Sequence, residues 1–312
     1  MKVSVLMAAH NSAAFIQIAL DSMVAQTERD WELLVTDDGS TDDTAAIVEA
    51  VGRTDPRVRL LRHETAKGPA AARNTALREA RGEWVTILDS DDAFAPERLE
   101  RMVKIAEERR LDFLADNLIL VDFETRRHLG EAFPKQWMSG EQLIDLHWFV
   151  KQNWPSEEID TQPFGIVKPL ARRAFLERQN LWYDEKIRCG EDFLLYGEAL
   201  LAGARFGLTS DALYLYSMRA TSLSRVRSSW LRNFKDLSMV NDRLRGAIDS
   251  SDRALQETLR VRGYALHYNV FSFSWKDRDI PSALRSAAKM PPGYILQRMS
   301  ESAKKRLQRS RT

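Results

Sequence analysis

Mostly apolar segments alternate with amphipathic segments through the first 115 residues of this chain. The apolar segments are short enough to be strands and cover residues 3–7, 32–36, 58–61 and 84–88. Between them apolar side chains recur every three or four residues, as from Phe15 to Val24, which is typical of helices. Strands that are apolar on both faces lie in sheets covered on both sides. The pattern therefore predicts an α/β fold with a mostly parallel sheet flanked by helices.

Polar clusters directly follow three of the predicted strands. They are His10–Asn11, Asp37–Ser40 and Asp89–Asp92. Asn11–Ser12 are also placed to cap one helix, and Ser40 with Asp43 to form a capping box for the next. Sheets of this kind bind ligands at the carboxyl ends of their strands, so we expect the three clusters to converge on one crevice.

The cluster Asp89-Ser90-Asp91-Asp92 carries three carboxylates in four residues. Their mutual repulsion favours a compensating cation, and Mg²⁺ or Mn²⁺ prefers oxygen ligands shared with a nucleotide's phosphates. A capping turn before the helix that Pro96 opens is the alternative interpretation.

Asp38 is the candidate in the second cluster, since a carboxylate at a strand end can accept hydrogen bonds from a base or a ribose hydroxyl. A simple acidic turn would look the same. The chain has no G-x-G-x-x-G after its first strand and no G-x-x-x-x-G-K-[ST], which argues against hydride transfer on a dinucleotide and against P-loop phosphoryl transfer.

Three later segments carry further candidate groups. Lys67–Asn74 opens a helix and includes Arg73, which could neutralise a diphosphate or pair with an acidic strand end. Cys189–Phe193 contains Glu191 and Asp192, which are either first-turn acids of a helix or a source of a general base. Residues 216–225 combine arginines with hydroxyls and suit either phosphate binding or an ordinary polar loop.

Taken in order and spacing, these motifs resemble the family 2 glycosyltransferases of the GT-A (nucleotide-diphospho-sugar transferase) fold. The matching motifs are V-S-V-L-M-A-A-H-N, D-D-G-S-T-D-D-T, G-P-A-A-A-R-N, D-S-D-D, G-E-D and R-A-T-S-L-S, spread over residues 1–225. The resemblance implies transfer of a sugar from a nucleotide diphosphate with inversion at the anomeric carbon. It favours UDP as the nucleotide, and glucose is the first candidate for the sugar.

The same resemblance implies a role for individual residues. Asp192 would be the general base, and Asp91 and Asp89 would hold Mg²⁺ or Mn²⁺ and the sugar nucleotide, with Asp91 the stronger candidate for direct coordination. The remaining candidates would bind the donor: Ala8, His10 and Asp38 at the nucleoside, Arg73 near the diphosphate, and Arg219, Ser222 and Ser224 in a loop closing over it. His10 departs from the aromatic or proline-containing versions of its motif.

Charge is distributed unevenly along the chain. Residues 1–225 hold 28 Lys and Arg against 37 Asp and Glu, whereas residues 226–312 hold 18 against 8. We therefore expect a GT-A domain over 1–225, with nucleotide-binding and acceptor-binding halves of about 1–115 and 116–225, followed by a basic, mainly helical extension over 226–312. The basic segment suggests an anionic membrane surface or a phosphorylated lipid as partner; nucleic acid and a merely solvated helical surface compete with it.

The resulting hypothesis is an inverting hexosyltransferase of exopolysaccharide or cell-surface polysaccharide synthesis. Its acceptor would be a saccharide, free or carried on a polyprenyl diphosphate, without nucleic acid. No apolar run reaches the roughly 20 residues of a membrane span, and the single cysteine fits a reducing compartment. The expected location is therefore cytoplasmic, either free or peripheral on the inner face of the membrane. A sugar-nucleotide nucleotidyltransferase and a non-catalytic carbohydrate- or lipid-binding protein are the alternatives.

Overall fold

A computed structural model of the chain describes residues 1–138, 143–154, 163–219 and 230–309. These residues fall into two compact units: the larger comprises the described residues up to Arg219 except Trp154, and the smaller comprises Trp154 and the described residues from Trp230 onward. The boundary expected after residue 225 lies outside the described residues.

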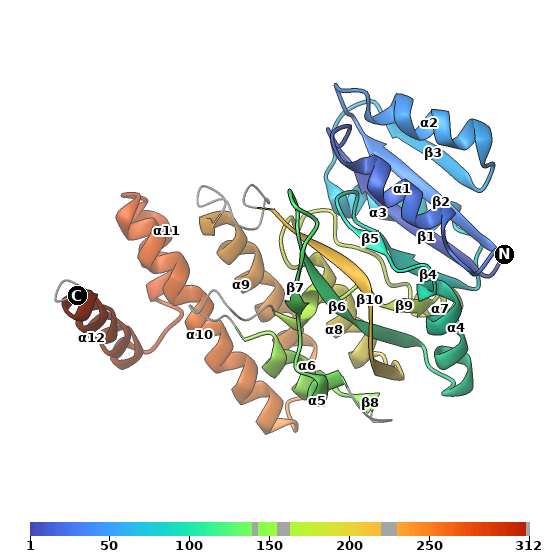
Figure 1. The fold of residues 1–312 in the computed structure, drawn as a ribbon. Helices are drawn as coiled ribbons and strands as arrows, with labels where there is room; N and C mark the ends of the chain where they lie inside the picture. The colour runs from blue at the N-terminus through green and yellow to red at the C-terminus, as the bar shows by residue number, and fades with distance from the viewer. Residues whose placement is uncertain (139–142, 155–162, 220–229, 310–312) are drawn as a thin grey trace. The chain divides into compact units, whose positions relative to one another are not determined.

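The first half of the larger unit alternates strands and helices as the sequence predicts (Figure 1). Its elements are β1 (Val3–Ala9), α1 (Ile16–Val24), β2 (Trp31–Asp38), α2 (Thr44–Thr54), β3 (Val58–His63), α3 (Pro69–Glu79), β4 (Trp84–Ile87), β5 (Ala93–Phe94) and α4 (Arg98–Glu108). The apolar residues of β1 and β2 are buried, because α1 and α2 cover one face of these strands and α3 the other. The mixed α/β architecture is confirmed.

The second half of this unit completes the sheet with shorter elements. They are β6 (Phe113–Asp122), β7 (His128–Glu131), α5 (Lys135–Met138), β8 (Leu143–Ile144), α6 (Leu146–Gln152), η1 (Phe164–Ile166), β9 (Leu170–Arg172), α7 (Arg173–Arg178), α8 (Glu191–Leu201) and β10 (Phe206–Met218). The main path through the sheet runs β3-β2-β1-β4-β9-β6-β10-β5, and off this path β7 pairs with β6 and β8 with β10.

Strand direction and register decide which loops meet. Strands β1 to β4 are parallel, and Leu6 of β1 lies opposite Leu34 and Ile87, so the loops that follow these strands emerge together. Strand β9 runs antiparallel to β4, with Ala171 opposite Val85. The segment that precedes β9 therefore reaches the edge of the sheet at which β4 ends.

Two predicted helix starts are wrong by a few residues. Helix α1 begins at Ile16 and α2 at Thr44, and neither has a side-chain cap. The expected capping groups bond between the loops instead: the backbone N of Asn11 donates to Oγ of Ser40 at 3.0 Å, and the backbone N of Thr41 donates to Oδ1 of Asn11 at 2.9 Å. These bonds join the β1 and β2 loops.

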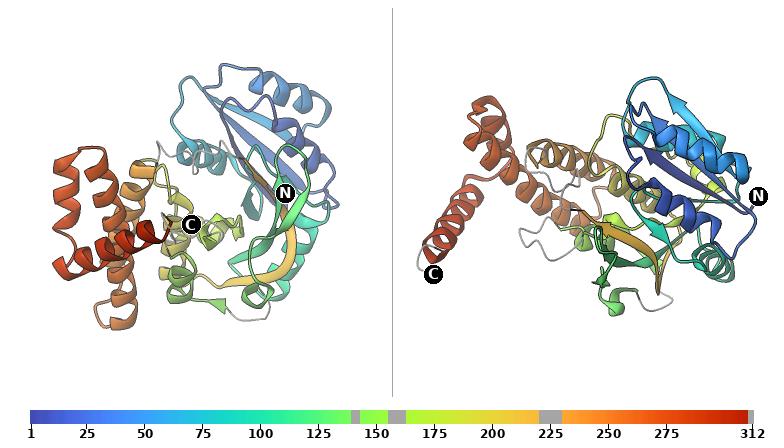
Figure 2. Two further views of the ribbon diagram at one scale, coloured as in Figure 1. Left: turned by 60° about the vertical axis from the view of Figure 1, so that its left-hand side comes forward. Right: turned by 45° about the horizontal axis from the view of Figure 1, so that its top comes forward.

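The smaller unit is helical. It consists of α9 (Trp230–Ala247), α10 (Arg253–Lys276), α11 (Ile280–Ala287) and α12 (Pro292–Arg309), with α9 and α10 side by side in both views of Figure 2. Buried Leu244, Leu259 and Leu266 lie among its core residues. Within the described residues, none of the helices combines the length and apolar character that a membrane span requires.

Candidate active site

The three carboxylates after β4 occupy three different environments. Asp92 is buried and accepts hydrogen bonds from the hydroxyl of Tyr214 and the backbone N of Ser217, both at 2.7 Å. Burial, with the nearby charges of Asp91 and Asp89, raises the pKa of Asp92 well above its usual value. Its bonds to β10 give Asp92 a structural role: it fixes the loop that carries the other two.

Asp89 lies between two buried cations. Nη2 of Arg73 donates to its Oδ1 at 2.9 Å, and Nζ of Lys168 lies 3.2 Å from its Oδ2. The side chains of Arg73 and Lys168 are only 6% and 5% exposed. Burial alone would raise the pKa of Asp89, but the charges of Lys168 and Arg73 outweigh it and lower that pKa well below the usual range. Asp89 is therefore ionised and neutralised by the protein itself.

The same two cations hold the acidic pair at the start of α8. Lys168 donates from Nζ to Oδ2 of Asp192 at 2.8 Å, while Nη1 of Arg73 donates to Oε1 of Glu191 at 3.0 Å and lies 3.5 Å from Oδ1 of Asp192. Gly190 precedes the helix with φ of +91°, a conformation that side chains rarely adopt. Residues 73, 89, 168, 191 and 192 thus form one cluster, which we call the buried charge cluster.

One carboxylate oxygen of Asp192 accepts no hydrogen bond from the described residues. Among the residues that the structure describes, no donor hydrogen-bonds to Oδ1 of Asp192, whereas Oδ2 is bonded to Lys168. Burial, followed by the charge of Asp192, raises the pKa of neighbouring Glu191. The pair is thus divided: Glu191 is bonded to Arg73, whereas Oδ1 of Asp192 is buried and lies 3.5 Å from Nη1 of Arg73 without a hydrogen bond.

Asp91 and Arg219 form a separate pair at the edge of the cluster. Nη1 of Arg219 lies 3.3 Å from Oδ2 of Asp91, and its guanidinium stacks 4.3 Å from the ring centre of Phe15 and 4.8 Å from that of Phe123. Burial and the charge of Asp89 raise the pKa of Asp91. Unlike Asp89, Asp91 has only one cation among the described residues, so further positive charge beside it would be stabilising.

On the side of the site predicted to bind the nucleoside, Asp38 connects several segments. Its carboxylate accepts hydrogen bonds from the backbone N atoms of Lys67 and Gly68, at 2.9 and 2.7 Å, and its Oδ1 lies 2.7 Å from Nδ1 of His63. Burial would raise the pKa of Asp38, but these bonds lower it. The carboxylate that was predicted to contact a base or a ribose therefore also anchors the turn that starts α3.

His10 has a defined tautomer. Its Nδ1 lies 2.8 Å from the carbonyl oxygen of Asp38, which can only accept, so Nδ1 carries the proton. Asn11 then donates from Nδ2 to Nε2 of His10 at 3.3 Å. Ala8, also predicted to line the site, lies opposite Thr36 near the end of β1. Both are at the edge of the sheet to which β4 leads.

The structure thus brings Asp89, Arg73 and Asp192 into one cluster, with Asp91 and Arg219 beside it. Ser222 and Ser224 lie outside the described residues. Sequence reasoning missed Lys168 and His63. A lysine within the apolar run Gly165–Leu170 was the available signal for Lys168, since a buried lysine needs anionic partners. Its backbone is fixed by Arg98, whose Nη2 donates to the carbonyl of Lys168 at 2.6 Å.

Comparisons with known proteins show the family to which the chain belongs. Residues 4–149 match the family described as "Glycosyl transferase family 2". The succinoglycan biosynthesis protein ExoO of Rhizobium meliloti is 35% identical over 98% of this chain and 86% of its own length. ExoU of the same organism is 36% identical over 71% of this chain and 64% of its own. Residues 1–349 of S. aureus TarS, crystallised with UDP, match with a TM-score of 0.63 and 25% identity over 88% of this chain and 73% of that one.

Proposed function

Because the chain belongs to glycosyltransferase family 2, with the GT-A fold and relatives in exopolysaccharide synthesis, we propose that it transfers a hexose from a UDP-sugar with inversion, using Asp192 as base. The observation that carries the proposal is the buried charge cluster. Lys168 and Arg73 each approach both Asp89 and Asp192, which are 103 positions apart in the sequence. A donor group beside the β4 loop would therefore be close to a base on α8.

The reaction needs one displacement. The hydroxyl oxygen of the acceptor forms a bond to the anomeric carbon while the bond from that carbon to the diphosphate oxygen breaks, and the electron pair leaves with the diphosphate. The hydroxyl proton passes to Oδ1 of Asp192, which accepts no hydrogen bond from the described residues. Attack on the face opposite the departing diphosphate inverts the anomeric configuration.

Lys168 and Arg73 position this base and do not contact the leaving group in our proposal. Both are already paired with carboxylates, and Lys168 directs Oδ2 of Asp192 away from the reacting proton. The cation proposed to face the diphosphate is Arg219, whose guanidinium lies over the rings of Phe15 and Phe123. Ser222 and Ser224 would supply hydroxyl donors from the segment that follows.

The donor set at the β4 loop fits a divalent metal shared with substrate phosphates. No set of three carboxylate, imidazole or thiolate groups able to hold a metal unaided occurs in the described part of the chain. Mg²⁺ commonly takes only one or two protein carboxylates and completes its ligands with phosphate and water, which suits Asp91 with its single cation partner. When bound, Mg²⁺ or Mn²⁺ would neutralise charge on the diphosphate. Asp89 is the weaker ligand candidate, because Arg73 and Lys168 already use its oxygens.

The nucleoside would bind along the β1 and β2 loops, beside Ala8, His10 and Asp38. UDP is favoured because TarS, 25% identical, was crystallised with it, and glucose is the first sugar to test. The acceptor we propose is a saccharide, free or on a polyprenyl diphosphate, met at the inner membrane surface through the basic segment 226–312. ExoO, similar over 86% of its length, is named for succinoglycan biosynthesis.

Donor turnover tests this proposal against its alternatives. The protein would be incubated with UDP-glucose, other UDP-sugars, Mn²⁺ and a lipid-linked saccharide fraction, and UDP and product would be measured. A glycosyltransferase releases UDP and gives a product whose anomeric configuration is inverted on NMR. A nucleotidyltransferase, given UTP and a sugar 1-phosphate in a parallel incubation, would instead release pyrophosphate. A binding protein would release neither UDP nor pyrophosphate.

A further inference from the structure

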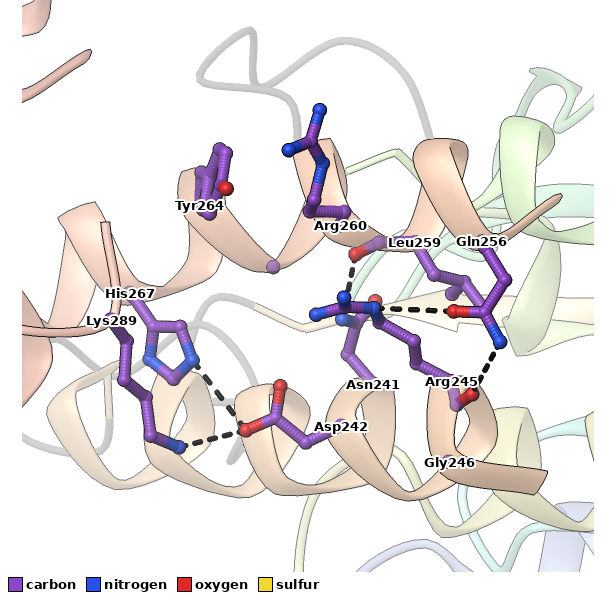
Figure 3. A pocket seen from close by; sticks show the side chains of 11 residues that line it. Asn241, Asp242, Arg245, Gly246, Gln256, Leu259, Arg260, Tyr264, His267 and Lys289 are labelled. Atoms are coloured by element: carbon purple, nitrogen blue, oxygen red, sulfur yellow. Dashed lines mark hydrogen bonds and ion pairs between the residues drawn. The ribbon is translucent and has the colours of Figure 1, made fainter. Parts of the chain in front are cut away.

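The helical unit contains a cleft of about 470 Å³ that the proposed reaction does not use (Figure 3). It lies between α9 and α10 and is closed at one end by the segment after α11. Most of its lining side chains are charged or polar: Asp242, Arg245, Arg260, Tyr264, His267 and Lys289. Its volume falls within the range of small-molecule sites, roughly 300 to 1,000 Å³.

Two glycines border this cleft, one at the C-terminal end of α9 and one inside α10. Gly246 of α9 and Gly263 of α10 both line it. A Cβ on Gly246 would meet no atom within 4 Å, and one on Gly263 would lie 3.0 Å from Nδ2 of Asn241. Gly263 lies inside its helix, where glycine is among the least favourable residues, and Gly246 lies in the last turn of α9. Neither packing nor a positive φ demands glycine at position 246, so what it provides there is space.

The anionic group in the cleft is already paired. Oδ2 of Asp242 lies 2.8 Å from Nζ of Lys289 and 3.6 Å from Nε2 of buried His267, and Figure 3 shows both side chains directed at this one carboxylate. The three groups come from α9, α10 and the segment after α11. They fix one end of the cleft.

Arg245 and Arg260 also line the cleft, and Arg245 forms no salt bridge among the described residues. Arg245 donates from Nε to Oε1 of Gln256 at a long 3.4 Å, and Gln256 is oriented by bonds from its Nε2 to the carbonyls of Arg245 and Ile248. Arg260 pairs with Glu257 on the same helix, but both side chains are about half exposed, and such pairs are weak. Both guanidiniums can therefore turn to a ligand.

We propose that this cleft binds a small anionic ligand carrying a phosphate or diphosphate group. Guanidinium groups match phosphate oxygens two at a time, and Arg245 of α9 and Arg260 of α10 line the same cleft. The same chemistry is offered by a free diphosphate and by the headgroup of a polyprenyl diphosphate. The proposal does not depend on the function proposed above, because none of the lining residues belongs to the candidate active site.

Equilibrium dialysis of ³²P-pyrophosphate against the full chain tests this site. The measurement is made without divalent metal and in the Arg219→Gln variant, so that binding at the proposed donor site contributes little. We expect one bound pyrophosphate, weakened about tenfold or more by Arg245→Gln. Arg253→Gln, which removes an exposed arginine of α10 outside the cleft, should leave the affinity unchanged.

A second variant removes space and keeps the charge. Gly246→Leu should block pyrophosphate binding, and since leucine favours helix more than glycine, circular dichroism should show a folded protein with an unchanged or higher Tm. Flotation with phosphatidylcholine vesicles that contain a polyprenyl diphosphate separates the two sources: binding lost in Gly246→Leu assigns the site to a lipid headgroup, and binding of pyrophosphate alone assigns it to a soluble ligand. Equal pyrophosphate affinity in Arg245→Gln, Gly246→Leu and Arg253→Gln would overturn the proposal.

Discussion

Asp89 and Asp91 are two residues apart in one loop, yet the protein surrounds them differently. Asp89 belongs to the buried charge cluster, where Arg73 and Lys168 neutralise it and lower its pKa. Asp91 lies at the edge of that cluster with Arg219, and burial beside Asp89 raises its pKa. Two cations of the protein already face the carboxylates of the cluster, whereas Asp91 in the edge pair has one cation partner among the described residues. A metal and a diphosphate would therefore contribute most beside Asp91.

This difference separates the charges that position the proposed base from the charges that would bind the substrate. Charges that must hold a base in place are paired in advance, at the cost of removing several ions from water. The charges that would contact the substrate, those of Asp91 and Arg219, have fewer ion-pair partners. Four substitutions examine this division, in order of decreasing expected effect.

Asp192→Asn should lower the transfer rate by about 10³-fold, since removal of a general base typically costs 10²- to 10⁴-fold. The amide keeps the shape of the side chain but cannot take up the proton. UDP affinity, measured by calorimetry with Mn²⁺, should stay within a few-fold of wild type. The control Asp30→Asn, at an exposed carboxylate, should change neither the transfer rate nor the UDP affinity by more than a few-fold. Wild-type transfer by Asp192→Asn would remove Asp192 from its role.

Lys168→Met should destabilise the protein by about 3 kcal/mol at pH 7, because it leaves buried carboxylates with one cation fewer. The lowered pKa of Asp89 contributes stability that is present above its ordinary pKa and lost as the pH falls through its folded value. The difference from wild type should therefore shrink on acidification toward that pKa. Urea unfolding at several pH values measures this, with exposed Lys151→Met as the control. A loss that does not change with pH would show that lost packing, and not charge, is responsible.

Asp91→Asn should weaken UDP binding in the presence of Mn²⁺ by roughly tenfold to 100-fold, in the range of losses seen when groups around a metal are removed. Without Mn²⁺, wild type and variant should bind UDP alike. Calorimetric titrations with and without EDTA provide the comparison. If Asp91→Asn retained the full effect of Mn²⁺ on UDP affinity, the metal would lie elsewhere.

Asp92→Asn should have the smallest effect of the four substitutions, and it should stabilise the protein. The raised pKa of Asp92 means that the folded protein favours its protonated form, so stability declines as the pH rises above the ordinary carboxyl pKa. An amide can still bond to Ser217 and Tyr214 without carrying charge. The variant should therefore be more stable than wild type by about 1 kcal/mol at pH 8, and less so at pH 4, in thermal unfolding. Equal pH dependence in both proteins would contradict this.

Local sequence patterns predicted the strands and their order along the chain well, because the apolar runs of β1, β2 and β4 are buried by helices that the same patterns specify. In β3, at the end of the sheet, Val58 is the only apolar residue that is buried. Helix starts were less predictable, since Ser40 and Asn11 bond between loops that only the fold brings together. Lys168 was missed for the same reason. Its partners, Asp89 and Asp192, lie 79 and 24 positions away in the sequence, and only the antiparallel course of β9 brings it to them.

A crystal structure with UDP and Mn²⁺ bound would examine the division most directly. We predict Mn²⁺ bound to Asp91 and to the diphosphate, with Arg73 and Lys168 still on Asp89 and Asp192 and the β-phosphate beside Arg219. Mn²⁺ held by Asp89 after displacement of Arg73 and Lys168, or UDP bound on a surface that Asp192 does not reach, would contradict the account.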